Sequence, residues 1–236
     1  MIKLKLQQFA APGSLSALRS ATFDKLQLNC GIFIKNFVYT GTGAPENAGA
    51  LLTMIKGIIG GTVTGKGDLL GVTRGGGQFS VGREMRNPDI DGLRYRFKGG
   101  TFVDSADPYL STTLVETTPE NFAAAMGGTA TTSGKITTVK MATALTDDSY
   151  LDNLCWVGEL GDGRLVLINI YNALNTSDIT FTFQDKSEGA LAVEFHACQD
   201  EVDDYDDAPF EVVFFDKAAG RNPARGEGET PPPFFT

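Results

Sequence analysis

Cysteine and histidine are scarce in this 236-residue sequence, which contains three cysteines and one histidine. Cys30, Cys155 and Cys198 lie far apart and form no Cys-x-x-Cys pair. A structural zinc site needs four ligands at close spacing, and His196 alone cannot complete one. A sparse, odd number of cysteines is typical of buried thiols in a reducing compartment. The sequence therefore argues against both a disulfide framework and a zinc centre.

Long apolar runs are also missing, since no stretch of about 18 uncharged apolar residues occurs in the chain. We therefore expect no membrane-spanning helix. The first six residues, Met1 to Leu6, alternate lysine with aliphatic side chains and do not form the apolar core of a secretory signal. We expect the protein to remain in the compartment where it is made.

Positive charge is in deficit, because 20 Lys and Arg residues face 29 Asp and Glu residues, for a net charge of −9. The distribution is uneven: residues 1–100 carry a net +7 and residues 101–236 a net −16. An acidic total argues against a nucleic-acid-binding protein that neutralises phosphates. Two halves of opposite sign can satisfy each other within one chain or between identical copies.

Glycine, by contrast, is abundant, with 28 residues, and threonine is frequent. Glycine in turns between runs of Thr, Val, Ile and Phe indicates strands. Alternation is clearest where Leu191, Val193, Phe195 and Ala197 share one face. These patterns predict a mainly β fold, a sandwich or barrel with one or two short helices. The predicted strands are 30–39, 78–85, 93–103, 136–145, 155–160, 164–171, 179–183, 190–198 and 210–215.

Two segments predict the helices. Thr118-Pro119-Glu120 combines a capping Thr, a Pro at the first helical position and an acid near the positive end of the helix dipole. In this helix Phe122, Ala125 and Met126 fall at spacings of three and four, so we expect one stripe to cover an open end of the sandwich. A second helix is predicted between residues 45 and 61.

The composition divides the chain into three parts. Residues 1–28 read as an N-terminal arm, and residues 29–216 as one β-sandwich domain. One large domain fits this length, because all-β domains often reach it undivided. Residues 217–236, with three consecutive prolines, predict a flexible C-terminal tail that cannot bury a core.

Residues 60–77 are rich in glycine and predict a loop that is mobile or ordered by a partner. Their first seven positions, Gly60 to Lys66, match a phosphate-binding loop. The eighth position is Gly67, where that motif needs a Ser or Thr hydroxyl for magnesium. The residues after it also begin a helix poorly. We therefore interpret the segment as a glycine loop and not as a nucleotide site.

Glu194, His196 and Cys198 alternate along a predicted strand and therefore share one face. Such a face could hold a metal ion or pair a nucleophile with a base. Packing against a neighbouring sheet or subunit explains the pattern equally well. No partner acid or second histidine is predicted nearby, so we favour the structural interpretation.

Two charged segments have simpler interpretations than a binding site. Arg94, Arg96 and Lys98 alternate with apolar residues in the strand predicted at 93–103, and a solvated or salt-bridged face is favoured over phosphate binding. The acidic run at 201–207 lacks the spacing of a twelve-residue calcium loop and predicts an exposed loop. We therefore expect no catalytic, cofactor-binding or metal-binding residues.

Six segments go further when they are taken in order: NCGIFIKNF at 29–37, LLGVTRGGG at 69–77, RNPDIDG at 86–92, ETTPENF at 116–122, LVLINI at 165–170 with NALN at 172–175, and VEFHA at 193–197. Their order and spacing resemble those of tail tube, or major tail, proteins of long non-contractile-tailed bacteriophages. The resemblance covers roughly residues 28–215. It carries no catalytic residue.

The resemblance implies a β-sandwich or barrel with a flanking helix, assembled into hexameric rings that stack as the conduit for DNA during ejection. It implies copies of the chain itself, a tape-measure protein, a tail terminator and tail-tip proteins as partners, with no membrane and no specific DNA binding. The protein would be made in the host cytoplasm and reside in the virion tail. The candidate subunit-interface residues are Arg74, Gly75, Gly76, Gly77, Arg86, Arg94 and Arg96.

A tube that passes DNA must not retain it, and each phosphate paired with Lys or Arg adds affinity. We therefore expect a net negative channel wall, with its acids drawn mostly from residues 147–216, and a basic first half that faces neighbouring subunits. Two alternatives stay open. One is the tube protein of a bacterial contractile injection apparatus, and the other is a β-sandwich module that binds carbohydrate or calcium.

Overall fold

The structure is a computed structural model that describes residues 20–27, 31–92, 94–183, 185–186, 188–200 and 207–217. Several predictions lie wholly or partly outside these residues. They concern most of the N-terminal arm (1–19 and 28), the tail from residue 218 onward, six of the seven acidic-run positions (201–206) and Cys30. Of the other cysteines, Cys155 is buried, Cys198 is partly buried, and both are free thiols.

The described chain is mainly β, as predicted, with two α-helices. In chain order the elements are η1 (Ser20–Lys25), β1 (Ile32–Lys35), α1 (Ala48–Ile59), β2 (Asp68–Leu69), β3 (Thr73–Arg86), β4 (Phe102–Leu114), α2 (Pro119–Ala125), β5 (Thr129–Ser133), β6 (Ile136–Lys140), η2 (Asp147–Ser149), β7 (Leu151–Glu159), β8 (Leu165–Asn175), β9 (Thr180–Thr182), β10 (Ala190–His196) and β11 (Phe210–Phe215).

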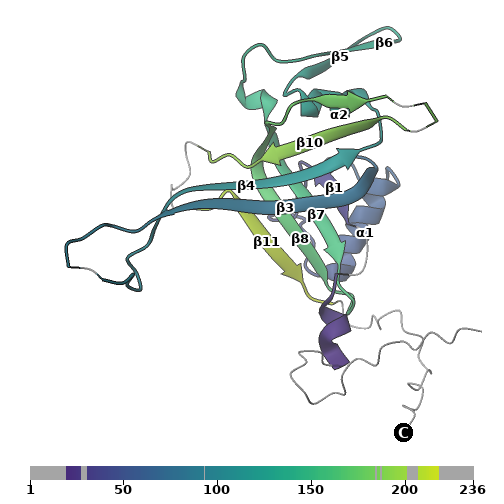
Figure 1. Cartoon of the computed structure of the whole chain (residues 1–236). Helices are drawn as coiled ribbons and strands as arrows, with labels where there is room; N and C mark the ends of the chain where they lie inside the picture. Colours follow the sequence, from purple (N-terminus) through teal and green to yellow (C-terminus); the bar gives the residue numbers. More distant parts are fainter. Residues whose placement is uncertain are drawn as a thin grey trace, which may run out of the picture.

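Nine strands form one antiparallel sheet in the order β2-β1-β7-β8-β10-β4-β3, with β11 also beside β8 and β9 beside β10. Strand β8 joins two halves, because its first six residues pair with β11 and its last two pair with β10. Figure 1 shows β3, β4 and β10 crossing in front of β7, β8 and β11. We call β1, β2, β7, β8 and β11 the helix half, because α1 packs on it. We call β3, β4, β9 and β10 the arm half, after the long β3–β4 hairpin, which is unrelated to the N-terminal arm. The β5–β6 hairpin forms a separate two-stranded sheet.

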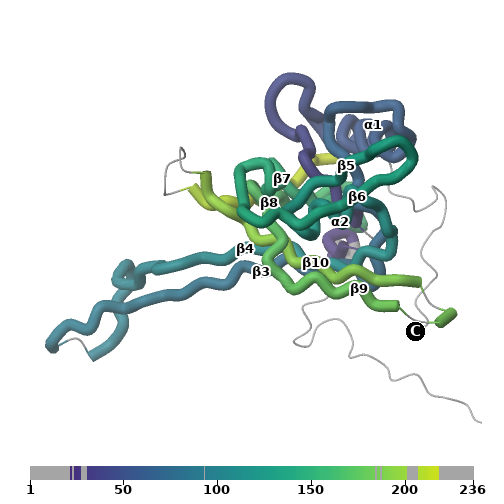
Figure 2. Tube along the Cα trace, turned by 90° about the horizontal axis from the view of Figure 1, so that it is seen from above, coloured from purple at the N-terminus to yellow at the C-terminus, as the bar shows by residue number. Residues whose placement is uncertain are grey.

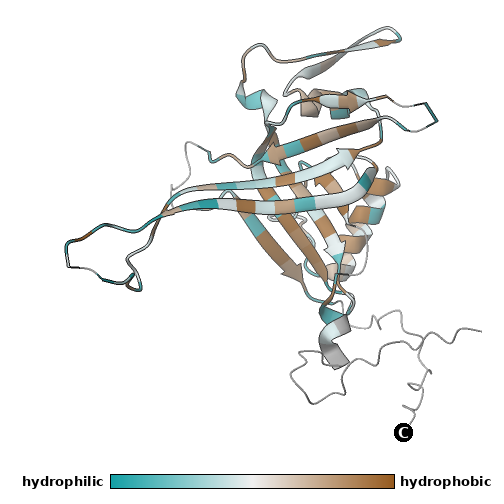
Figure 3. Ribbon diagram, in the orientation of Figure 1, coloured by the Kyte–Doolittle hydropathy of each residue, from teal (hydrophilic) through white to brown (hydrophobic). Residues whose placement is uncertain are grey.

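Two hydrophobic clusters define three layers. The first lies between α1 and the helix half, and includes Leu51 and Ile55 of α1 with Leu167 of β8. The second lies between the two halves and includes Leu154 of β7 and Phe195 of β10. Strands β7 and β8 therefore bury both faces, as strands in the middle of a layered fold must. Figure 3 shows the hydrophobic residues that gather on β10, β11 and α1.

Local signals explain why the two helices begin where they do. The side chain of Asn47 accepts a hydrogen bond from the backbone N–H of Ala50 at 3.0 Å, so α1 starts at residue 48 inside its predicted range. The hydroxyl of Thr118 accepts from the N–H of Asn121 at 3.2 Å, which confirms the predicted start of α2. The face that α2 buries was predicted less well, because it centres on Asn121 and Ala125. Phe122 is only partly buried and contacts the ring of Phe181.

The predicted strands around 78–85, 190–198 and 210–215 are confirmed as β3, β10 and β11. The strand predicted at 93–103 is wrong, because residues 94–101 lie in the turn of the β3–β4 hairpin and the strand begins at Phe102. The prediction also missed most of β4 and all of β5. Neither described helix is long and apolar enough to cross a membrane.

The cluster between the two halves generates the first prediction. Phe195 is 1% exposed within it, so Phe195→Ala should lower the free energy of unfolding by about 3–5 kcal/mol in a urea titration. Phe183→Ala is the matched control, because that ring is 81% exposed, and it should change stability by less than about 0.5 kcal/mol. Equal losses in the two variants would contradict the assigned core.

Candidate interaction surface

The β3–β4 hairpin extends well beyond the packed strands and helices, which we call the body (Figures 1 and 2). Its strands pair from Thr73 opposite Leu114 out to Arg86 opposite Phe102. Beyond Val81 on β3, and before Pro108 on β4, all strand residues are exposed. Figures 1 and 2 show this part projecting away from the body in two perpendicular views. We call residues 82–107 the arm, and residues 87–101 its tip.

The arm exposes apolar side chains that have no core of their own. Fifteen large apolar residues are exposed in the described part of the chain, and six of them lie on this short segment. This concentration of exposed apolar side chains makes the arm the candidate contact surface of the described chain. An isolated two-stranded ribbon is also only marginally stable in water. The six residues are Met85, Ile90, Tyr95, Phe97, Phe102 and Val103.

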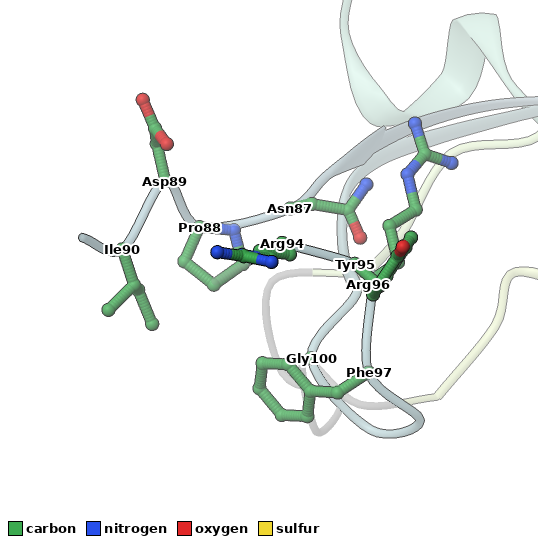
Figure 4. A pocket seen from close by; sticks show the side chains of 9 residues that line it. All are labelled: Asn87, Pro88, Asp89, Ile90, Arg94, Tyr95, Arg96, Phe97 and Gly100. Atoms are coloured by element: carbon green, nitrogen blue, oxygen red, sulfur yellow. The ribbon is translucent and has the colours of Figure 1, made fainter. Parts of the chain in front are cut away.

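The tip holds two of the candidate arginines. Arg94 and Arg96 line a small hollow of about 200 Å³ with Pro88, Tyr95 and Phe97, and Figure 4 shows their guanidinium groups pointing to different sides of it. The predicted basic strand face is therefore wrong, because the backbone here is not a strand and does not align alternate side chains. Both arginines are exposed, and neither forms an ion pair with any described residue.

The other two candidate arginines are held by acids of the same chain. Arg86 Nε lies 3.1 Å from Asp104 Oδ2 across the arm, and its guanidinium lies over the ring of Phe102. Arg74 pairs with Glu188 at the opposite end of β3. A backbone hydrogen bond, followed by Arg74, lowers the pKa of Glu188. The structure thus brings Arg86 close to the tip and leaves Arg74 far from it.

The glycines at 75–77 form a bulge within β3. Arg74 lies opposite Thr113 and Gly77 opposite Thr112, so Gly75 and Gly76 have no partner on β4. Both adopt positive φ, 75° and 79°, which glycine tolerates without strain. The hydroxyl of Thr112 donates to the carbonyl of Gly76 at 2.8 Å and fixes the bulge.

The single loop predicted at 60–77 is also wrong. Residues 68–69 form β2 on the edge of β1, and Leu70 is fully buried. The segment Gly60 to Gly67 connects α1 to a strand and not to a helix, so it lacks the context of a phosphate-binding loop. The ammonium group of Lys66 donates to the carbonyl of Thr42 at 3.3 Å.

His196 has two acidic partners: Glu194, which the sequence placed on the same strand face, and Asp107, which the sequence prediction missed. Its Nδ1 lies 2.6 Å from Asp107 Oδ1 of β4, and its Nε2 lies 3.0 Å from Glu194 Oε1 of β10. Because the two carboxylates occupy opposite ring nitrogens, one metal ion could not bind all three groups. Among the described residues no group of three or more His, Cys, Asp or Glu side chains is placed to hold a metal ion.

Cys198, the third residue of the predicted face, is not activated as a nucleophile. Burial, followed by the charge of Asp107, raises its pKa above the usual value. A thiol of raised pKa carries little thiolate at neutral pH, and the thiolate is the reactive form.

A second polar cluster ties β11 to the body. The hydroxyls of Tyr39 and Tyr171 lie 2.6 Å apart and both donate to Glu211, while the amide of Asn169 donates to Tyr39 at 2.7 Å. Burial, followed by the hydrogen bond to Glu211, raises the pKa of both tyrosines. The phenols therefore stay protonated and act as hydrogen-bond donors that position β11.

A comparison of the sequence with models of known protein families found no match, and neither did a comparison with curated proteins.

The bulge generates the second prediction. A Cβ at residue 77 would lie 2.5 Å from the ring of Phe33 and 2.9 Å from the carbonyl oxygen of Ser111, so Gly77→Ala should cost about 1–3 kcal/mol of stability. Gly82→Ala, on the same strand, would place its Cβ 3.8 Å from the nearest atom and should cost less than about 0.5 kcal/mol. Thermal unfolding of the two variants measures the difference, and equal melting temperatures would refute the packing described for Gly77.

Proposed function

We propose that the chain is a structural subunit that assembles with copies of itself into stacked hexameric rings, the tail tube of a long non-contractile-tailed bacteriophage. The arm is the observation that carries this proposal. The paired part of the arm exposes both faces of a two-stranded ribbon, and no described residue of the chain covers its apolar side chains. A neighbouring copy supplies such a surface in every ring.

The shape of the molecule favours a head-to-tail contact. An arm that docks on the body of the next copy joins two different surfaces, so the contact is heterologous and repeats from copy to copy. Such contacts close into rings or continue as filaments, and a tube of stacked rings uses both. The sequence resemblance sets the number of subunits in the proposed ring at six.

Charge favours the same arrangement. The arm as a whole carries five basic and five acidic side chains, but its tip presents Arg94 and Arg96, which have no acidic partner among the described residues. The part of the chain after residue 100 carries a net −16. Contact between the tip of one copy and an acidic surface of the next would pair these charges and orient the subunits.

The outer face of the arm half is our choice for the channel wall. No described helix or strand lies over it, whereas α1 covers the outer face of the helix half. Its side chains include the acids Glu84, Asp107 and Glu194, several serines and threonines of β3 and β4, and the imidazole of His196, which lies between Asp107 and Glu194. Arg74 at one end is paired with Glu188. A wall with this excess of carboxylates keeps DNA from binding over the screening length of about 8–10 Å.

The remaining roles belong to the same proposal. The tape-measure protein, tail terminator and tail-tip proteins are the proposed partners at the ends and in the lumen of the tube, and the virion tail is the proposed location. A tube of a contractile injection apparatus would use the same kind of subunit contact. A carbohydrate- or calcium-binding module would instead remain monomeric. Assembly into rings or tubes therefore distinguishes a tube subunit of either kind from a binding module.

Removal of the arm is the test. Arg83 and Ala106 lie directly opposite each other in the hairpin, so residues 84–105 can be replaced by a two-residue Asn-Gly turn that suits this register. The shortened chain should fold, because the deletion removes no buried residue of either hydrophobic cluster. It should remain monomeric in light scattering, while the full chain forms rings or tubes under negative-stain microscopy.

The matched control changes an exposed residue of the β5–β6 hairpin. Ser133 and Ile136 are paired in the β5–β6 hairpin, and Ile136→Ser removes the exposed apolar residue there. This variant should assemble like the wild type if the arm carries the main contact. Normal tubes from the armless chain would overturn the proposal.

The channel wall generates a separate prediction. Ala192 is exposed on the outer face of the arm half, so Ala192→Lys should place a ring of positive charge in the lumen. Assembled tubes of this variant should retain double-stranded DNA in co-sedimentation, with an affinity that falls as salt rises. Ile59→Lys, at the end of α1 and 56% exposed, is the control and should retain none. Intact Ala192→Lys tubes without bound DNA would show that another face lines the channel.

A further inference from the structure

His196 occupies the place where the arm leaves the body. It is the last residue of β10 and pairs with Tyr109 of β4. The next residue, Ala197, donates its N–H to the carbonyl of Pro108 at 2.9 Å, and Pro108 is the last buried residue of β4 before the arm. Asp107, which contacts the imidazole, is the first residue on the arm side of this boundary.

The ring is fixed on three sides. Asp107 and Glu194 lie at its two nitrogens, from two different strands, and the ring of Tyr109 stacks on it at 5.1 Å between centroids. The imidazole is 18% exposed, whereas the side chains of Asp107 and Glu194 are 63% and 39% exposed. The contact therefore holds a nearly enclosed ring between two acids that water can still reach.

This geometry suits only the charged ring. An imidazolium donates from both nitrogens and satisfies both carboxylates, whereas a neutral imidazole donates from one and turns a lone pair toward the other acid. We propose that His196 is a protonation-dependent clamp: the charged ring holds the root of the arm to β10, and loss of its proton releases Asp107 or Glu194 and loosens the root.

The surrounding groups favour the charged form. Burial opposes the charge, but the hydrogen bonds to Asp107 and Glu194 outweigh it and raise the pKa of His196 above the usual 6.5. The other titratable or charged groups on this face are Tyr109 of β4, Glu84 of β3, Cys198 just beyond β10, and Arg74, which pairs with Glu188 at the other end of β3. Among the described residues neither Asp107 nor Glu194 has an ion pair with Lys or Arg.

The direction of the pH dependence follows from this raised pKa. The clamp contributes its full stability below about pH 6.5, the usual value for a histidine in an unfolded chain. That contribution is lost as pH rises through the higher pKa of the folded state. The arm should therefore be fixed at its root in mild acid and freer in mild base.

The test uses the full chain, and its single histidine makes the signal unambiguous. Slow hydrogen–deuterium exchange at the imidazole Cε1–H, followed by mass spectrometry, gives the pKa of His196 directly. We expect a value above 6.5 in the wild type, and a lower value in Asp107→Asn. Asp104→Asn, which removes the acid that pairs with Arg86 and not with His196, should leave the value unchanged.

Amide exchange of the peptide that contains Ala197 reports the root of the arm. After correction for intrinsic exchange, its protection should fall about tenfold or more between roughly pH 6 and pH 9 in the wild type. His196→Gln should show the low protection at every pH. If that variant does not fold, the comparison of wild type with Asp107→Asn decides the matter. A pKa at or below 6.5, or protection of Ala197 that does not change with pH, would overturn the proposal.

The clamp does not depend on the tube function, because both measurements can be made on monomers or on assemblies. A chain that never assembles can still show the transition, and an assembling chain can lack it.

Discussion

The pairing of β3 with β4 is the constraint on which the rest of the structure depends. Strands of 14 and 13 residues extend for roughly 45 Å at about 3.3 Å per residue. The body covers only the half that lies next to β10 and β8. One continuous ladder thus builds part of the core and also carries apolar side chains out into solvent. No described residue covers these side chains, and for this reason we propose that a second copy of the chain does.

Several local features keep this ladder in register. The bulge places two unpaired residues, Gly75 and Gly76, near the start of β3. The missing side chain of Gly77 lets the ring of Phe33 pack against the strand. Pro108 marks the other boundary. The pairing of β10 with β4 ends at Tyr109, so the missing backbone N–H of Pro108 leaves no strand hydrogen bond to β10 unmade. His196 adds the only imidazole in the chain at the same boundary. Glycines placed among the interface candidates therefore have a structural role that is visible within one chain.

Local sequence patterns predicted those helices and strands that are specified by residues close to one another in the chain. The cap at Thr118 and the alternation of β10 are examples, because each reports a nearby hydrogen bond or a buried face. The same alternation misled at Arg94 and Arg96, where exposed charges and aromatics alternate in a tip that is not a strand. The arm portion of β4 is exposed on both faces and has no buried side to generate a pattern, whereas its body portion does alternate but was missed all the same.

The contact between Asp107 and His196 could not be predicted from spacing, because the two residues are 89 positions apart and meet only through the register of β4 and β10. The same holds for Arg74 and Glu188, which are 114 positions apart. Charge segregation, in contrast, was visible in the sequence alone, and the structure adds the place where part of the basic charge is presented.

Electron cryo-microscopy of the particles formed by the purified full chain tests the central claim most directly. The account predicts a hollow tube of stacked rings in which the apolar side chains of the arm lie buried against a neighbouring subunit, while the carboxylates of Asp107 and Glu194 face the lumen. A monomer at all concentrations, or an assembly in which the arm projects freely into solvent, would contradict it.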